Sequence, residues 1–157
     1  MYSIDTSFFM DWQARFYPLD VFVTMNTSIE QLIDKGEFIA VELVKEEINA
    51  VGTPDPKSWA ANHKNLLVPL TPNIQLEAAA IEAKYPELTD PKSPYQSADA
   101  YVIAFARLRG GDVVSQETSV NEKHKPAKNY YIPDVCRDLG VPCINLLGLL
   151  RREKWTF

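Results

Sequence analysis

Four acidic residues occupy positions where a metal site could form. Asp5 ends a predicted strand, Glu47 and Asp99 lie in the first two turns of predicted helices, and Glu117 follows a predicted strand by two residues. In open parallel sheets, ligands bind beyond the carboxyl ends of the strands, so residues at these positions are the first candidates. Carboxylates that converge repel one another, and clustered oxygen ligands suit Mg²⁺ or Mn²⁺. Such a site could activate water and stabilise an in-line displacement at phosphorus, which indicates phosphodiester hydrolysis.

Each of the four acids also has a purely structural interpretation. Asp5 could be no more than the cap of a helix that starts at Thr6. Asp99 could lie in a first helical turn because the helix dipole favours a carboxylate there. Glu47 could belong to a solvated helix face and Glu117 to an exposed loop, which are common places for Glu. Position alone therefore leaves both interpretations open.

The elements that must position these acids alternate along the chain. A helix is expected directly after Thr6 and Ser7, which are helix-cap residue types. Apolar runs predict strands at residues 2–5, 38–41, 66–70, 112–115 and 141–145. Helical spacing and caps predict further helices at residues 18–35, 42–50, 57–64, 71–85, 98–108 and 133–139. This alternation predicts an α/β fold with three layers (α/β/α), a mostly parallel sheet and a single domain over residues 1–157.

Composition excludes several classes of protein. Hydrophobic residues make up 46% of the 157 residues and charged residues 24%, a globular balance that argues against disorder. The apolar runs are too short to span a membrane, and the N-terminus lacks a basic leader, so we expect a cytoplasmic protein. Cys136 and Cys143 have poor spacing for zinc ligands. The sequence has no Ser/His/Asp order, phosphate-binding glycine loop or dinucleotide motif.

The net charge of −5 is unusual for a nucleic-acid binder, because neutralising phosphates requires clustered Lys and Arg. Basic residues do gather in one part of the chain: Arg107, Arg109, Lys123, His124, Lys125 and Lys128. We therefore expect a local basic rim beside the acidic pocket. Tyr130 and Tyr131, beside Lys125 and Lys128, are candidates for contacts with the backbone and bases of a nucleic acid.

Four short phrases resemble the successive acidic motifs of the PIN-domain family, and they occur in the family's order. They are Ile4-Asp5-Thr6-Ser7, Val44-Lys45-Glu46-Glu47-Ile48, Ser97-Ala98-Asp99-Ala100-Tyr101-Val102-Ile103-Ala104 and Val113-Val114-Ser115-Gln116-Glu117. The ending, from Ile132-Pro133-Asp134-Val135-Cys136 through Gly140-Val141-Pro142-Cys143, is similar to a PIN-like branch of prokaryotic proteins of unknown function. The resemblance covers nearly the whole chain.

This resemblance implies a sheet of about five strands, Mg²⁺ or Mn²⁺ as cofactor, and endoribonuclease activity. It implies that Asp5, Glu47, Asp99 and Glu117 bind the metal and that Ser115 takes the family's usual hydroxyl position in the catalytic site. Many prokaryotic relatives are VapC-type toxins. The resemblance therefore also implies a type II toxin–antitoxin module, with RNA as substrate, a cognate antitoxin protein as partner, and a homodimer.

Four points keep this interpretation open at the sequence level. The family more often has Asp where this chain has Glu117, and the longer side chain could alter the second metal position. Glu46 competes with Glu47 as the ligand on its helix. The chain could also be a catalytically inactive PIN-like module that binds protein or RNA, or a nuclease for another substrate such as a DNA flap.

Overall fold

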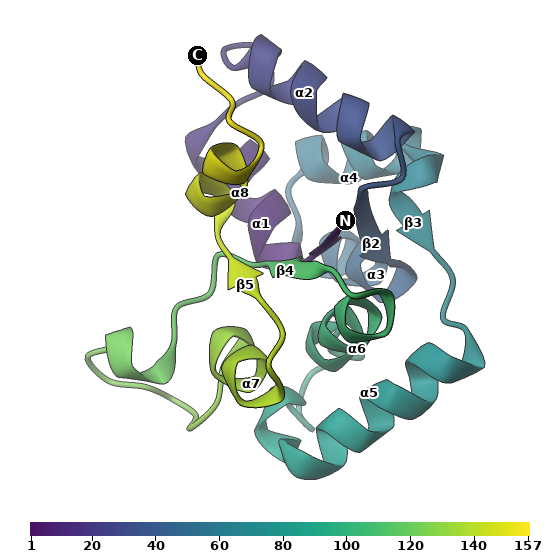
Figure 1. The fold of residues 1–157 in the computed structure, drawn as a ribbon, viewed down its shortest axis with the longest axis vertical. Helices are drawn as coiled ribbons and strands as arrows, with labels where there is room; N and C mark the ends of the chain where they lie inside the picture. Colours follow the sequence, from purple (N-terminus) through teal and green to yellow (C-terminus); the bar gives the residue numbers. More distant parts are fainter.

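A five-stranded sheet forms the middle layer of the molecule, and every strand pair in it is parallel, which confirms the predicted fold class. The computed structural model describes residues 1–157, apart from the side chain of Ala14. The strand order is β3-β2-β1-β4-β5 (Figure 1). The strands are β1 (Tyr2–Ile4), β2 (Phe38–Val41), β3 (Leu67–Val68), β4 (Asp112–Val114) and β5 (Cys143–Ile144).

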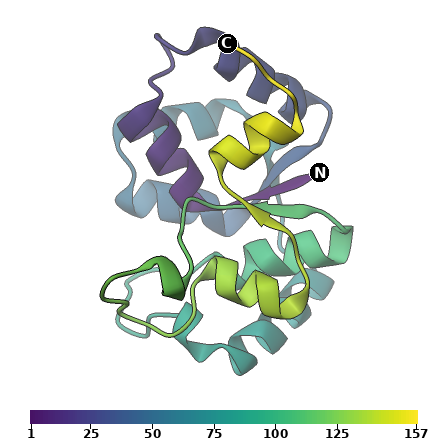
Figure 2. The same ribbon diagram turned by 60° about the vertical axis from the view of Figure 1, so that its left-hand side comes forward.

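Helices cover both faces of this sheet. One face carries α1 (Thr6–Asp11), α2 (Val23–Asp34), α4 (Pro54–Asn62) and α8 (Leu146–Arg152). The opposite face carries α5 (Pro72–Lys84), α6 (Asp99–Arg109) and α7 (Ile132–Leu139), as Figures 1 and 2 show. Directly after β2 comes α3 (Glu42–Val51), which contacts α1. No helix in the described part of the chain is long and apolar enough to cross a membrane.

Short helices of other types join these elements. The π-helix η1 (Trp12–Phe16) continues α1, and the 3-10 helices are η2 (Lys64–Leu66), η3 (Pro86–Leu88) and η4 (Val120–Glu122). The segment from η4 to α7 contains most of the basic stretch that the sequence analysis identified. It runs beside α7, outside the three layers (Figure 2).

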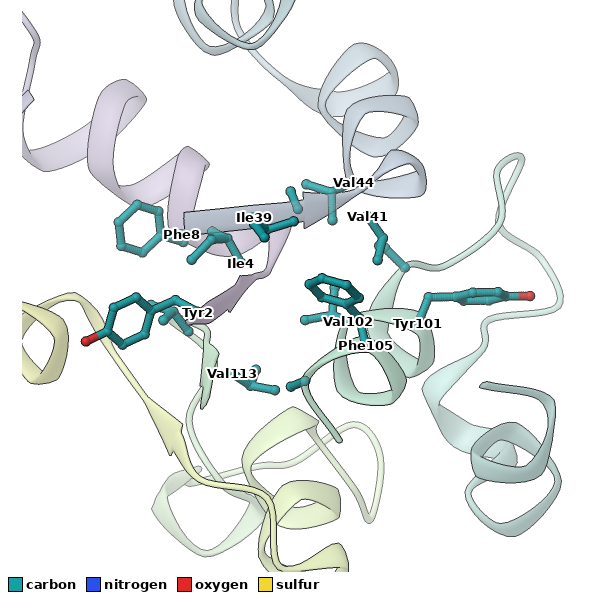
Figure 3. Close-up of a cluster of buried hydrophobic side chains, with 14 of the residues drawn as sticks. Tyr2, Ile4, Phe8, Ile39, Val41, Val44, Tyr101, Val102, Phe105 and Val113 are labelled. Atoms are coloured by element: carbon teal, nitrogen blue, oxygen red, sulfur yellow. The ribbon is translucent and has the colours of Figure 1, made fainter. Parts of the chain in front are cut away.

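The hydrophobic core lies on both sides of the sheet. Ile4 and Phe8 pack on the α1 side, and Val102 and Phe105 of α6 pack on the other (Figure 3). Every residue of α6 from Ala100 to Ala106 is buried, because this helix lies across the centre of the sheet and is itself covered by α5 and α7. Strands that are buried on both faces read as continuous apolar runs in the sequence.

Several element boundaries differ from the prediction. The helix expected from Pro18 begins only at Val23, because Pro18 O accepts the amides of Val21 and Phe22 in a turn. The helix expected over residues 57–64 begins at Pro54, a residue well suited to a first helical turn. The outer strands β3 and β5 are shorter than the predicted strands at 66–70 and 141–145.

The sequence analysis missed α8 entirely. This helix begins after Asn145, whose side-chain oxygen accepts the Gly148 amide at 2.9 Å. Asn is among the strongest helix caps, so Asn145 was the available signal.

The register of the two central strands positions the first part of the site. Ile4 of β1 pairs with Val114 of β4, so the next residues, Asp5 and Ser115, leave the sheet side by side. The Asp5 amide donates to Val114 O at 3.0 Å and continues the ladder by one residue. Parallel pairing thus brings together two residues that lie 110 positions apart.

Candidate active site

The four predicted acids line one cavity of ≈ 300 Å³ at the carboxyl ends of the strands. Asp5 follows β1, Glu47 projects from α3, Asp99 begins α6 and Glu117 follows β4. Thr6, Ser7, Ser97 and Lys128 line the same cavity. The structure therefore brings together all four residues that sequence reasoning selected, although they come from four separate elements.

Asp5 is held in place by hydroxyl groups. It caps α1, and its Oδ2 accepts the Ser7 amide at 3.3 Å and the Ser7 hydroxyl. Ser115 Oγ donates to the same oxygen at 2.9 Å. Ser115, which the resemblance assigns to the catalytic site, is buried and is not among the described residues that line this cavity; it lines a neighbouring one with Glu117. The capping interpretation of Asp5 is therefore confirmed, and the same carboxylate also lines the cavity, where its role as a metal ligand stays a prediction.

Glu47 is buried and accepts hydrogen bonds at both carboxylate oxygens. Ala98 donates its amide to Oε1 at 2.8 Å, and the Thr6 hydroxyl donates to Oε2. Glu46 is exposed, so of these two neighbours Glu47 is the one at the cavity. Its solvated-face interpretation is thereby excluded.

Asp99 lies in the first turn of α6, where Ser97 Oγ accepts its amide at 3.3 Å. Ala98 occupies the N-cap position of this helix, one residue after Ser97. The Asp99 carboxylate faces Lys128, whose Nζ lies 3.7 Å from its Oδ2. Lys128 brings a positive charge into an otherwise acidic cavity.

Glu117 is half-buried and links β4 to α7. Its Oε2 accepts the Ile132 amide at 3.0 Å, at the start of α7, and its own amide donates to Ser115 Oγ at 3.1 Å. The exposed-loop interpretation of Glu117 is therefore wrong. The Glu117 side chain, which is one methylene longer than Asp, contacts the start of α7 and also lines the cavity.

Burial and mutual repulsion make the four carboxyl groups harder to ionise than usual. The pKa of Asp99 lies well above its ordinary value, first because of desolvation and then because of the charges of Asp5 and Glu117, with Lys128 opposing. Desolvation likewise raises the pKa values of Asp5, Glu47 and Glu117, and hydrogen bonds from their neighbours partly offset it. Groups with such pKa values cluster at functional sites.

The donor set fits a hard divalent cation. Carboxylate oxygens are the ligands that Mg²⁺ and Mn²⁺ prefer, and a bound cation would offset the repulsion that raises these pKa values. Among the described residues, no group of three or more His, Cys, Asp and Glu side chains is already arranged to hold a metal ion.

The sequence did not predict that two further residues, Thr6 and Ser7, hydrogen-bond to the acids of this site. Thr6 and Ser7 were expected only as helix-cap types, yet their hydroxyls bind Glu47 and Asp5. Ser7 Oγ also accepts the Gln116 amide at 2.9 Å and lies 3.2 Å from Ser115 Oγ. Their position directly after Asp5 was the signal that could have identified them.

Only one residue of the expected basic rim, Lys128, lines the cavity among the described residues. Arg107 instead forms an ion pair with Glu77 of α5. Tyr131 is buried, and the ammonium groups of Lys123 and Lys128 lie 4.2 and 5.0 Å from its ring centroid. Tyr131 is therefore unable to stack on a base in this conformation.

The family model described as Domain of unknown function (DUF4411) matches residues 2–157. None of the curated proteins matches the chain.

Proposed function

We propose that this chain, which belongs to the family described as Domain of unknown function (DUF4411), is a Mg²⁺- or Mn²⁺-dependent endoribonuclease. The observation that carries the proposal is the convergence of Asp5, Glu47, Asp99 and Glu117 on one cavity at the carboxyl end of a parallel sheet. The choice of RNA rests on the order of the acidic motifs, which resembles that of the PIN-domain ribonucleases.

A bound divalent cation would supply Lewis acidity and a lowered pKa of water, which is the chemistry that phosphodiester hydrolysis needs. The protein's part is to position the carboxylates. Ser7 and Ser115 fix the orientation of Asp5, and Thr6 fixes that of Glu47. Burial and the neighbouring carboxylates raise the pKa of Asp99 well above its usual value, and its carboxyl group lines the cavity beside Lys128, so a bound cation would relieve this repulsion.

The four residues differ in how much freedom they have. The Asp5 and Glu47 carboxylates are each held by at least two hydrogen bonds, whereas the Glu117 carboxylate accepts the Ile132 amide at one oxygen. The carboxylate of Asp99 is paired with a flexible lysine. We therefore assign Asp5 and Glu47 as fixed ligands, and Asp99 and Glu117 as ligands that adjust when the metal binds.

The test is RNA cleavage by purified wild-type protein, D5N and D99N in the presence of Mn²⁺ and in EDTA. We expect cleavage by the wild type only with metal and little or none by either variant. Cleavage by both variants at the wild-type rate would overturn the proposal. Structured RNA, single-stranded RNA and flap DNA, compared side by side, test the substrate class.

We also propose that this ribonuclease is the toxin of a type II toxin–antitoxin module that forms a homodimer and is inhibited by a cognate antitoxin. The support for this role is the resemblance to VapC-type toxins. Expression of the wild type should arrest growth of a bacterial host, whereas expression of D5N should not. Unimpaired growth with an active, soluble wild type would contradict the toxin role.

A catalytically inactive module that binds protein or RNA is the second candidate. Two observations favour this candidate. The chain has a net charge of −5, and the Ile132 amide donates a hydrogen bond to Glu117 Oε2, one of the oxygens that would otherwise bind a metal. Tight RNA binding in EDTA without cleavage in any divalent metal would support this candidate over the first.

A further inference from the structure

Lys128 is the basic residue among the described residues that line the cavity, and the proposed hydrolysis gives it no role. Its side chain is 25% exposed, and its Nζ lies 3.7 Å from Asp99 Oδ2 and 5.0 Å from the ring centroid of Tyr131. Its charge also acts on Glu117. The ammonium thus lies beside one proposed metal ligand, Asp99, and the ring of Tyr131, and it partly offsets the burial that raises the pKa of a second, Glu117.

Hydrogen bonds hold the chain on both sides of Lys128. Asn129 donates its side-chain amide to Glu87 Oε1 at 2.7 Å and its backbone amide to the other oxygen of the same carboxylate. On the other side, the Ala127 amide donates to the Tyr131 hydroxyl at 3.1 Å. The base of the Lys128 side chain is therefore fixed, and its rotatable bonds alone decide where the ammonium lies.

Lys128 also lies at the junction of two cavities. Besides the acidic cavity, it lines a neighbouring cavity of ≈ 650 Å³ together with Asn129 and Tyr131. Rotation of the side chain about its own bonds would carry the ammonium away from Asp99 and into this neighbouring cavity, which Lys128 also lines.

We propose that Lys128 is a tethered counter-ion that neutralises Asp99 in the metal-free protein and moves onto a phosphate of the substrate when a divalent cation binds. This inference rests on the proposed function, because it assumes that the acidic cavity binds a cation. The physical reason is that an ammonium and a divalent cation repel each other at short range and compete for the same carboxylate. Once the ammonium has left Asp99, it would be free to bind a phosphate group of the substrate.

The test compares K128Q with K125Q. Lys125 is exposed and belongs to the same segment, so the two variants lose the same charge from the same part of the chain. In Mn²⁺ titration calorimetry, K128Q should bind about tenfold more tightly than the wild type, and K125Q should stay within about twofold. K128R keeps the charge and should bind Mn²⁺ like the wild type.

The second measurement concerns the substrate side. With a ten-nucleotide single-stranded RNA that carries slowly hydrolysed phosphorothioate linkages, binding in saturating Mn²⁺ should weaken about tenfold in K128Q and much less in K125Q. A third measurement needs no metal. The melting temperature in EDTA should fall further in K128Q than in K125Q, because Lys128 lies beside Asp99 and offsets the carboxylate charges, whereas Lys125 is exposed.

The possible outcomes separate this inference from the proposed function. Mn²⁺ binding by the wild type with equal affinities for K128Q and K125Q would overturn the role of Lys128 and leave the metal site intact. Tight Mn²⁺ binding by K128Q combined with weak binding by the wild type would support it most strongly. Absence of Mn²⁺ binding in all four proteins would overturn the proposed function and this inference with it.

Discussion

Glu47 Oε1 accepts the backbone amide of Ala98 at 2.8 Å, so a carboxylate of α3 holds the residue that precedes Asp99. The other oxygen of Glu47 accepts the hydroxyl of Thr6, the residue that follows Asp5. Glu47 thereby contacts the immediate neighbours of two other acids of the cavity. It links three of the four elements that build the candidate site.

Replacement of Glu47 by Gln should disturb the site, whereas replacement of Glu46 should not. Gln carries no charge for a metal, and its NH₂ group would face either the Ala98 amide or the Thr6 hydroxyl, so we expect at least about 100-fold weaker Mn²⁺ binding in E47Q. E46Q is the matched control, because Glu46 is exposed on the same helix. Calorimetry on both variants tests this, and equal affinities would contradict the assignment of Glu47.

Replacement of Asp5 by Asn should abolish metal-dependent cleavage with little effect on folding. Asn can keep one oxygen for Ser7 and Ser115, but it lacks the charge that a cation requires. We expect a loss of at least about 100-fold in kcat/KM, measured on the RNA that the wild type cleaves. D11N is the control, since Asp11 pairs with Arg15 on the surface and should retain full activity.

Removal of the Ser7 hydroxyl should weaken the site without removing a ligand. Ser7→Ala loses the donor to Asp5 and leaves the Gln116 amide without its acceptor. We expect about 10- to 100-fold weaker Mn²⁺ binding, and a loss of about 1 kcal/mol in the free energy of unfolding. Ser28→Ala on α2 is the comparison, and the same Mn²⁺ affinity in both variants would argue against the role of Ser7.

The metal-free protein should lose stability as the pH rises. A carboxyl whose native pKa exceeds its unfolded value of about 4 binds its proton more tightly when folded, so stability is greatest below that pH and falls as the pH rises through the native pKa. Asp99 should contribute most of this loss, because its pKa is raised well above normal. D99N in EDTA at pH 7.5 should therefore melt about 3 °C above the wild type.

Thermal unfolding of both proteins from pH 4 to 8 checks this prediction. The difference between D99N and the wild type should shrink toward pH 4, because Asp99 becomes increasingly protonated in the unfolded state as well as in the native one. A melting temperature of D99N below that of the wild type at pH 7.5 would mean that the ion pair with Lys128 outweighs burial and repulsion.

Asp134 should stabilise the fold and have no part in metal binding. It is fully buried, and its Oδ2 accepts the amides of Val120 and Tyr131 at 2.9 and 3.0 Å, tying η4 to the start of α7. Asp134→Ala leaves both amides without acceptors, so we expect a loss of about 3 kcal/mol in the free energy of unfolding by urea. Asp138→Ala, at an exposed position of the same helix, should lose much less.

The fold class was accessible from the sequence because it depends on local patterns. Buried parallel strands are short apolar runs, and helices show caps and 3.6-residue spacing, so β2 and α5 were predicted nearly to the residue. Positions after strands then selected Asp5 and Glu117, because the topology of a parallel sheet places all such positions at one edge. The predicted starts of the helices near Pro18 and Pro54 were wrong, because proline is common both in turns and in the first turn of a helix.

The sequence by itself determined which acids could meet, and the tertiary structure decided how they meet. The choice of Glu47 over Glu46 depends on which face of α3 packs against α1, a question of long-range packing. Lys128 lies beside Asp99 in a segment that Glu87 holds through hydrogen bonds from Asn129, and Glu87 is far from both in sequence. Such contacts join residues dozens of positions apart, and no local spacing encodes their distance, because it is set by strand register and by the packing of helices on the sheet.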